Sequence, residues 1–162
     1  MKRVVLALGS NVGDRAGFLE KSGMLIDCRV GKVVRSSRVY ETEAWGFEAP
    51  PFLNQALVSE TELSPEEVLV ATQQIEMELG RTLKSGRTAD GAPVYHNRTI
   101  DIDLLLYEGA VCTSDALTLP HPHIAQREFV LLPLAELFGD TVLPPFTISF
   151  QQMLNNLVES IK

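Results

Sequence analysis

The pattern of hydrophobic and polar residues along the chain alternates between short apolar runs and apolar residues repeated every three or four positions. Apolar runs bounded by turn residues predict strands, whereas apolar residues three or four positions apart predict helices. The predicted strands cover residues 4–8, 33–41, 52–61 and 98–107. The predicted helices begin after Asp14, after Ser64, at Leu132 and after Ser149. The helix after Ser64 has the clearest start, because Pro65 and Glu67 complete a capping box with proline at the first helical position.

The order of these elements is strand, helix, strand, strand, helix, strand, and then the C-terminal helices. This is the split βαβ order of ferredoxin-like folds. The 162 residues are 45% hydrophobic and their composition does not shift along the chain, so we expect one domain over residues 1–162. The predicted fold class is α+β: a ferredoxin-like βαββαβ sheet with additional C-terminal helices that cover its other face, giving a three-layer αβα domain.

The strand at 98–107 carries two acidic residues inside an apolar run. Asp101 and Asp103 should point to the same side of the strand, about 7 Å apart. The opposite side would be lined by Ile100, Ile102, Leu104 and Leu106. Burying unpaired carboxylates is costly, and a divalent cation such as Mg2+ would remove that cost. The alternative is a strand end at which both carboxylates face water or pair with Lys and Arg. These residues alone leave the two interpretations open.

The segment before this strand, residues 81–98, has no periodicity and is rich in basic residues. Its cations are Arg81, Lys84, Arg87 and Arg98, and its one acid is Asp90. Such a loop can neutralise a polyphosphate and close over it; the alternative is a solvated loop. Glu76, beside the apolar stripe of the preceding helix, would be either a half-buried partner of Arg81 or Arg98 or a solvated side chain.

Several other side chains suit a flat, polar ligand. Trp45 and Phe47 stand in a loop between two predicted strands and could cover a ring, or Trp45 could pack into the core. Phe52 and Asn54 share a strand face, where a planar amide beside an aromatic ring suits a heterocycle. Asn54 could equally satisfy nearby backbone groups. Prolines on both sides of His121 would hold its imidazole in place, although a single histidine is more often structural.

Composition narrows the class of protein. The formal net charge of −7 argues against a nucleic-acid binder that works by bulk electrostatics. Cys28 and Cys112 are far apart and form no CxxC motif, so we expect free thiols in a reducing cytoplasm. The N-terminal apolar run is too short for a signal peptide, and no stretch approaches the length of a membrane span. We therefore expect a cytoplasmic protein with no nucleic-acid or membrane partner.

Seven motifs, in their order and spacing, resemble one enzyme family. They are Leu8-Gly9-Ser10-Asn11-Val12-Gly13-Asp14-Arg15, Tyr40-Glu41-Thr42-Glu43, Phe52-Leu53-Asn54, Glu76 with Gly80-Arg81, Arg98-Thr99-Ile100-Asp101-Ile102-Asp103, Leu119-Pro120-His121-Pro122 and Arg127-Glu128-Phe129-Val130-Leu131-Leu132-Pro133-Leu134. Together they cover nearly the whole chain and resemble the 6-hydroxymethyl-7,8-dihydropterin pyrophosphokinases of folate biosynthesis.

The resemblance implies a reaction and its small-molecule partners. The hydroxymethyl oxygen of the pterin attacks the β-phosphorus of ATP, AMP leaves, and the pterin receives the diphosphate. ATP is the co-substrate, two Mg2+ ions are expected, and the protein is expected to be a monomer. Other readings of the same residues are a different Mg-dependent phosphoryl- or nucleotidyltransferase on a ferredoxin-like fold, or a non-catalytic nucleotide-binding module.

The resemblance also assigns residues. Asp101 and Asp103 match the metal ligands, and Arg81 and Arg98 match catalytic arginines that act on the triphosphate. The nucleotide-binding positions are Glu76, Arg81, Tyr95, Arg98, Ile102, His121 and Arg127. The pterin-binding positions are Thr42, Glu43, Trp45, Phe52, Asn54 and Phe129. Phe129 would stack on one side of the ring and Phe52 on the other.

The sequence departs from the family pattern at three places. Ala44 stands where many members have proline. Leu83 and Lys84 stand where the second loop arginine is expected, and Lys84 or Arg87 would have to substitute for it. Residues 125–126 are Ala-Gln where His-Glu is commoner. These differences concern the loops around the site and leave the two acidic residues in place.

Overall fold

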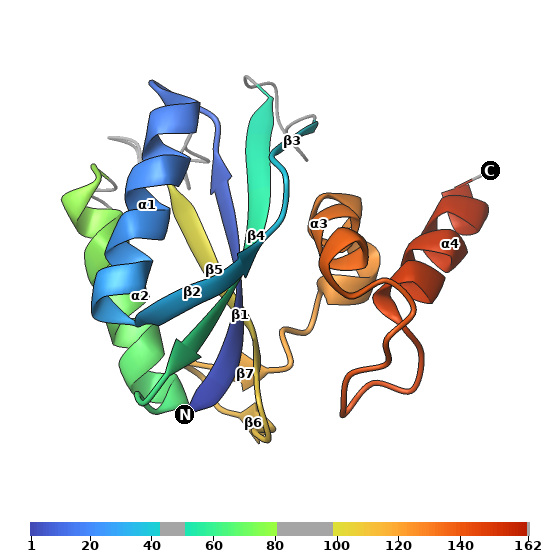
Figure 1. Cartoon of the computed structure of the whole chain (residues 1–162). Coiled ribbons are helices and arrows are strands. Elements are labelled where there is room, and N and C mark those ends of the chain that lie inside the picture. The colour runs from blue at the N-terminus through green and yellow to red at the C-terminus, as the bar shows by residue number, and fades with distance from the viewer. Residues whose placement is uncertain (43–50, 81–98, 162) are drawn as a thin grey trace, which may run out of the picture.

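The fold is built on one main antiparallel sheet with helices on both of its faces (Figure 1). The computed structural model describes residues 1–42, 51–80 and 99–161. The strands are β1 (Lys2–Ser10), β2 (Gly31–Ser36), β3 (Tyr40–Thr42), β4 (Phe52–Thr61), β5 (Asp101–Tyr107), β6 (Cys112–Thr113) and β7 (Thr118–Leu119). The helices are α1 (Arg15–Arg29), α2 (Pro65–Glu78), the short 3-10 helix η1 (Ile124–Gln126), α3 (Glu128–Phe138) and α4 (Phe150–Ile161).

The strand order confirms the predicted ferredoxin-like topology. The main sheet runs β2-β4-β1-β5, β3 continues the pairing along β4, and all of these pairs are antiparallel. Strand β4 lies between β1 and β2, so each βαβ unit is split by a strand of the other. Strands β6 and β7 form a separate two-stranded sheet.

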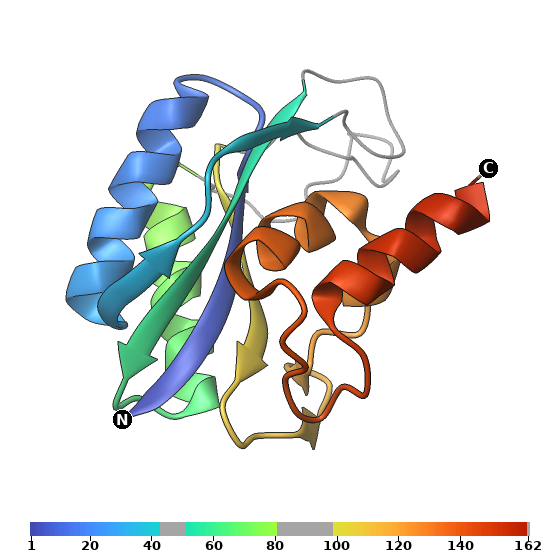
Figure 2. The same ribbon diagram turned by 45° about the vertical axis from the view of Figure 1, so that its right-hand side comes forward.

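Each face of the sheet has its own hydrophobic core. Residues such as Leu6 and Leu8 of β1 pack with Ile26 of α1 and Ile75 of α2 on one face. On the other face the alternate residues of the strands pack against α3, and Phe150 and Met153 of α4 belong to the same core (Figure 2). Helix α4 lies against α3, on its outer side, so the C-terminal helices complete the predicted third layer. Within the described ranges, no helix has both the length and the hydrophobicity that a membrane crossing needs.

Local signals were reliable where they were strongest. The boundaries of β4 agree with the predicted strand at 52–61. Asp14 caps α1 by accepting from Gly17 N at 3.0 Å. The capping box of α2 is complete, because Ser64 Oγ accepts from Glu67 N and Glu67 Oε1 accepts from Ser64 N.

Three predictions of local structure were wrong. The predicted strand at 33–41 is divided into β2 and β3, because the Ala56 amide of β4 donates to the buried Ser37 hydroxyl and not to a backbone carbonyl. The helix predicted at Leu132 begins at Glu128, so that Pro133 lies inside α3 and leaves the carbonyl of Phe129 without its helical donor. Leu106 belongs to the core beneath α3, because the pairing of β5 with β1 shifts by one residue at this point.

Two edge strands of the main sheet, β2 and β5, each have a backbone amide that donates to a carboxylate of a helix. At the β2 edge, Val33 N donates to Asp27 Oδ1 of α1 at 2.8 Å. At the β5 edge, Ile102 N donates to Glu76 Oε2 of α2 at 2.7 Å. These bonds use two amides that would otherwise be available to another strand.

Ser37 supplies the first testable prediction. Ser37 N donates to Ala56 O at 2.9 Å, and Ser37 Oγ accepts from the buried Ala56 N at 2.9 Å. The change Ser37→Ala leaves that amide without a partner and should lower the free energy of unfolding by about 1–3 kcal/mol. Urea unfolding followed by circular dichroism measures the loss. The neighbouring Ser36→Ala, at an exposed position, is the matched control, and equal stability of the two variants would contradict this role of Ser37.

Candidate active site

The two acidic residues of β5 lie at one end of the sheet, on the face that α3 covers. Asp101 is paired with Gly9 and Asp103 with Ala7. Ile102, between them, is only 6% exposed and points into the core beneath α1 and α2. Because side chains alternate along a strand, both aspartates point to the opposite face, as predicted. Both are partly exposed, so a ligand can reach them.

Glu76 fixes the backbone between these aspartates. It is 6% exposed, and its Oε2 accepts from Ile102 N at 2.7 Å. A carboxylate bonded to a backbone amide in this way is a strong, charge-assisted interaction. The structure therefore places the Glu76 side chain on strand β5, where it orders the segment that carries both acidic side chains.

Strands β1, β4 and β3 continue the same row of side chains across the sheet. Gly9 is paired with Asn54 on its other side, and Asn54 is paired with Tyr40. Residues that face each other across an antiparallel pair project to the same side. Asn54 is 6% exposed, and its Nδ2 donates to Thr42 Oγ1 at 2.6 Å. The amide and hydroxyl thus form one fixed polar group on the face that carries Asp101.

Gly9 keeps the space between these groups open. A Cβ at this position would lie 3.3 Å from Asn54 Oδ1 and 3.4 Å from Phe52 Cδ1. A side chain here would therefore push against the amide and the aromatic ring. The glycine leaves an uninterrupted floor between Asn54 and Asp101.

The segment after β7 brings His121 to the site. His121 N donates to Leu105 O at 2.9 Å, which attaches the segment to β5. The ring Nδ1 accepts from His123 N at 3.2 Å, so Nε2 is the nitrogen left to carry the proton of the neutral ring. Burial lowers the pKa of His121 below its ordinary 6.5, the charges of Arg127 and His123 lower it further, and the Asp101 carboxylate opposes them. His121 therefore lies within electrostatic reach of both Asp101 and Arg127.

The start of α3 contributes a cation and an aromatic ring. The guanidinium carbon of Arg127 lies 5.8 Å from the centre of the Phe129 ring, within cation–π range. Phe129 is partly buried against the core beneath α3, which leaves part of the ring accessible. The first turn of α3 also directs backbone amides and the positive end of its dipole toward this region.

The structure brings together only part of the predicted residue set. Described and gathered on or beside one face are Thr42, Phe52, Asn54, Asp101, Asp103, His121, Arg127 and Phe129. The side chain of Ile102 lies in the opposite core, and Glu76 bonds to the backbone. Outside the described residues lie Glu43, Trp45, Arg81, Tyr95 and Arg98, together with Ala44, Leu83, Lys84 and Arg87.

Asp101 and Asp103 suit a magnesium ion whose remaining ligands are phosphate oxygens and water. Over the described ranges, no group of three or more His, Cys, Asp or Glu side chains is placed to hold a metal. Two carboxylates on one strand face match the way Mg2+ binds through one or two acids, with phosphate oxygens and water completing its shell. Asp101 and Asp103 fit a magnesium site that forms together with a phosphate ligand.

Sequence reasoning missed three residues that shape this region. Gly9 leaves room on the floor, while Tyr40 and Glu136 join β3 to α3 through a hydrogen bond of 2.6 Å. The glycine belongs to a turn motif, but its position between Asn54 and Asp101 follows only from the strand register. Tyr40 and Glu136 are 96 residues apart, and no local pattern connects them.

The structure is a ferredoxin-like α+β domain that carries two partly exposed carboxylates on one face of its sheet. A family model described as 7,8-dihydro-6-hydroxymethylpterin-pyrophosphokinase (HPPK) matches residues 5–139. The chain therefore belongs to the HPPK family. Helix α4 lies beyond the matched residues.

Two relatives of similar length share one enzyme name, and a longer one is described as a folate synthesis protein. The chain is 48% identical over 138 residues to the 2-amino-4-hydroxy-6-hydroxymethyldihydropteridine pyrophosphokinase of Porphyromonas gingivalis, covering 84% of this chain and 90% of the relative. It is 42% identical over 134 residues to the Bacillus subtilis protein of the same name, covering 82% and 75%. A mitochondrial folate synthesis bifunctional protein of Pisum sativum is 39% identical over 142 residues, covering 87% and 26%.

Solved structures agree on the fold. A Plasmodium falciparum HPPK-DHPS crystallised with pteroate has a TM-score of 0.76 at 16% identity, covering 99% of this chain and 43% of that chain. An HPPK-DHPS in complex with substrates has a TM-score of 0.72 at 17% identity, covering 99% and 44%. The present chain thus spans less than half the length of either HPPK-DHPS chain.

The position of His121 gives a prediction about pH. Its ring should titrate below 6.5 in the folded protein, because burial and the Arg127 charge disfavour its protonation. Since the folded ring binds a proton less readily than the unfolded ring, its contribution to stability is lost as the pH falls from 6.5 through the lowered value. Proton NMR of the ring in a titration measures this pKa. Arg127→Gln should raise it and Asp101→Asn should lower it; the opposite signs would show that the ring does not lie between these two charges.

Proposed function

We propose that the chain transfers the pyrophosphoryl group of ATP to the hydroxymethyl group of 6-hydroxymethyl-7,8-dihydropterin, releasing AMP, in folate biosynthesis. The observation that carries the proposal is the register of the sheet. It sets Asn54, Gly9 and Asp101 in one row, and Asn54 is hydrogen-bonded to Thr42 on the same face. A polar planar ring and a charged phosphate tail can therefore bind side by side on one face.

The pterin would occupy the half of this row near β3. The Asn54 amide offers a donor and an acceptor to the edge of a heterocycle, and its bond to Thr42 fixes its orientation. Phe129 would lie against one side of the ring and Phe52 against the other. Glu43 and Trp45, from the family pattern, would complete this pocket.

The phosphate tail would lie over β5. Asp101 and Asp103 would hold Mg2+, and we propose two ions, which when bound supply Lewis-acid charge neutralisation to the phosphate oxygens. His121 and Arg127 would contact the nucleotide from the segment before α3. Arg81 and Arg98 would act as cationic clamps, with Tyr95 closing over the nucleotide and Lys84 or Arg87 supplying a further positive charge. The proposed working form is a cytoplasmic monomer.

The defining experiment measures the products. The protein, Mg2+, ATP and 6-hydroxymethyl-7,8-dihydropterin should give AMP and the pterin diphosphate in equal amounts. A pterin without the hydroxymethyl group is the control and should give no AMP. Release of ADP or inorganic pyrophosphate would instead favour another phosphoryl- or nucleotidyltransferase. Nucleotide binding without turnover would favour a non-catalytic module.

The acidic pair should be required for the chemical step. Because bound metal contributes several kcal/mol of charge stabilisation, Asp101→Asn and Asp103→Asn should each lower kcat by about 100-fold or more. The exposed Asp115→Asn is the matched control. Binding of the pterin, measured by calorimetry, should stay close to the wild-type value. Unchanged turnover in both single variants would reject the assignment of the metal ligands.

Gly9 should be required for binding of the pterin ring but not for binding of ATP. In Gly9→Ala the added Cβ would meet Asn54 Oδ1 at 3.3 Å. Crowding of this kind costs about 1–3 kcal/mol, which corresponds to about a 5- to 150-fold rise in KM for the pterin. KM for ATP should be unchanged. Gly23→Ala in α1, where a Cβ meets nothing within 4 Å, is the control. Equal KM values for the pterin in the two variants would contradict this placement of the ring.

A further inference from the structure

We propose that Tyr40 and Glu136 are positioning residues for the pterin: their contact sets the spacing between the Thr42–Asn54 group and the Phe129 ring. This inference deepens the proposed function and rests on it. The contact joins β3 to α3, the two elements that would carry opposite walls of the pocket. Neither Tyr40 nor Glu136 is among the residues proposed to contact the pterin or the nucleotide.

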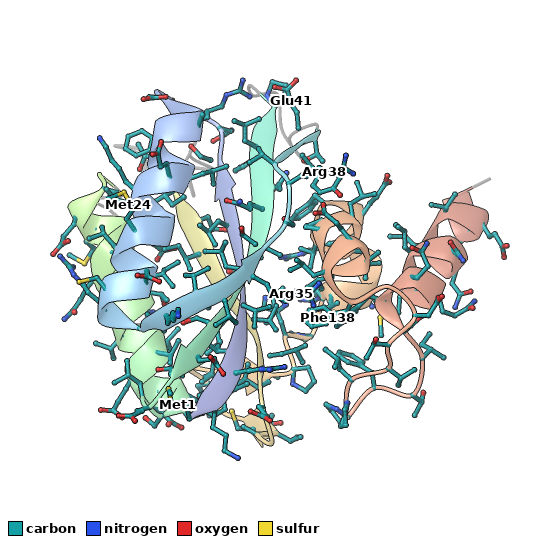
Figure 3. The ribbon with its side chains drawn as sticks, viewed as in Figure 1. Met1, Met24, Arg35, Arg38, Glu41 and Phe138 are labelled. Carbon is teal, nitrogen blue, oxygen red and sulfur yellow. The ribbon has the colours of Figure 1, made fainter. Side chains whose placement is uncertain are left out.

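The Glu136 carboxylate accepts hydrogen bonds from two residues of one short segment, Arg38 and Tyr40. Its Oε1 accepts from Tyr40 Oη at 2.6 Å. Its two oxygens accept from Arg38 N at 3.2 and 3.1 Å, and Arg38 Nε lies 3.4 Å from Oε1. Figure 3 shows Arg38 beside α3, projecting from the segment between β2 and β3. One carboxylate of the helix is thus bonded to both the backbone and the side chains of this segment.

The tyrosine and the backbone amide make the larger contribution. The Arg38 side chain is 78% exposed, so its ion pair with Glu136 is worth little in water. The Glu136 side chain is only 29% exposed, and the pKa of its carboxyl is lowered chiefly by the Tyr40 hydroxyl. Burial, followed by the bond to Glu136, raises the pKa of Tyr40. The hydroxyl therefore stays a donor and the carboxyl stays an acceptor across the neutral pH range.

Both partners are in register with proposed pterin contacts. Tyr40 is paired with Asn54, and Thr42 lies two residues further along β3 on the same face. Glu136 follows Phe129 by seven residues, which is close to two helical turns, so the two project from the same side of α3. The strand end that holds the polar group and the helix face that presents the ring are therefore tied at one point.

The fold does not need this contact to hold α3 in place. Leu131 and Leu134 are fully buried between the helix and the sheet. A second contact from the sheet reaches the same helix, where the Arg35 guanidinium lies 5.6 Å from the centre of the Phe138 ring (Figure 3). Arg35 comes from β2 and is not in register with Asn54. It supplies a matched control for a contact that is merely structural.

The test compares Tyr40→Phe and Glu136→Ala with Arg35→Gln. The readouts are the dissociation constant of 6-hydroxymethyl-7,8-dihydropterin in the presence of Mg2+ and α,β-methylene-ATP, the steady-state constants and the Tm. The first two variants should weaken pterin binding by about 3- to 30-fold, less than the full loss of a buried hydrogen bond to a charged group, because the Glu136 side chain is partly exposed. ATP affinity should be unchanged, and Glu136→Gln should recover part of the loss. Arg35→Gln should bind the pterin normally, with a Tm similar to the other variants.

A double-mutant cycle between Tyr40→Phe and Glu136→Gln adds a second criterion. If the two side chains act through one contact, the double variant should be no weaker than the worse single variant. Normal pterin binding by Tyr40→Phe, or an equal loss in Arg35→Gln, would overturn the positioning role and leave the proposed function intact. Failure of the wild-type protein to bind the pterin would overturn both.

Discussion

The antiparallel register of β1 between β4 and β5 is the constraint on which the site depends. With this register, the apolar side of β5 packs under α1 and α2 while Asp101 and Asp103 point to the other face. A slip of one residue would turn both carboxylates into the hydrophobic core and move the apolar residues out of it. The burial of one face therefore determines the chemistry of the other, and the capped helices α1 and α2 hold that burial in place.

The face beneath α3 has two uses. Toward one end, Val5, Ala56 and Leu105 form a dry core with Leu131 and Leu134. Toward the other, Asn54 and Asp101 are set on either side of Gly9, and the first turn of α3 contributes Phe129. Helix α3 thus contacts both the hydrophobic core and the candidate site. Its packing against the sheet therefore determines the position of Phe129.

The order of the elements, the limits of β4 and the shared side of the two aspartates could be predicted, because each follows from spacing within a few residues. The break at Ser37 could not, since its partner is Ala56 on another strand. The same holds for Glu76 with Ile102, 26 residues away, and for Tyr40 with Glu136. The start of α3 was predicted too late, because a proline is typical of the first turn of a helix. In this chain Pro133 lies inside the helix. Long-range partners have no local signature, and the family pattern alone pointed to the residues around Thr42 and Phe129.

The acids at the two borders of the sheet have a consequence for association between molecules. Asp27 and Glu76 each occupy an amide that a strand from another copy would need in order to extend the sheet. At the β5 border this same carboxylate also steadies the strand that carries the acidic pair. The protection of this sheet edge and the position of the acidic pair therefore depend on one side chain.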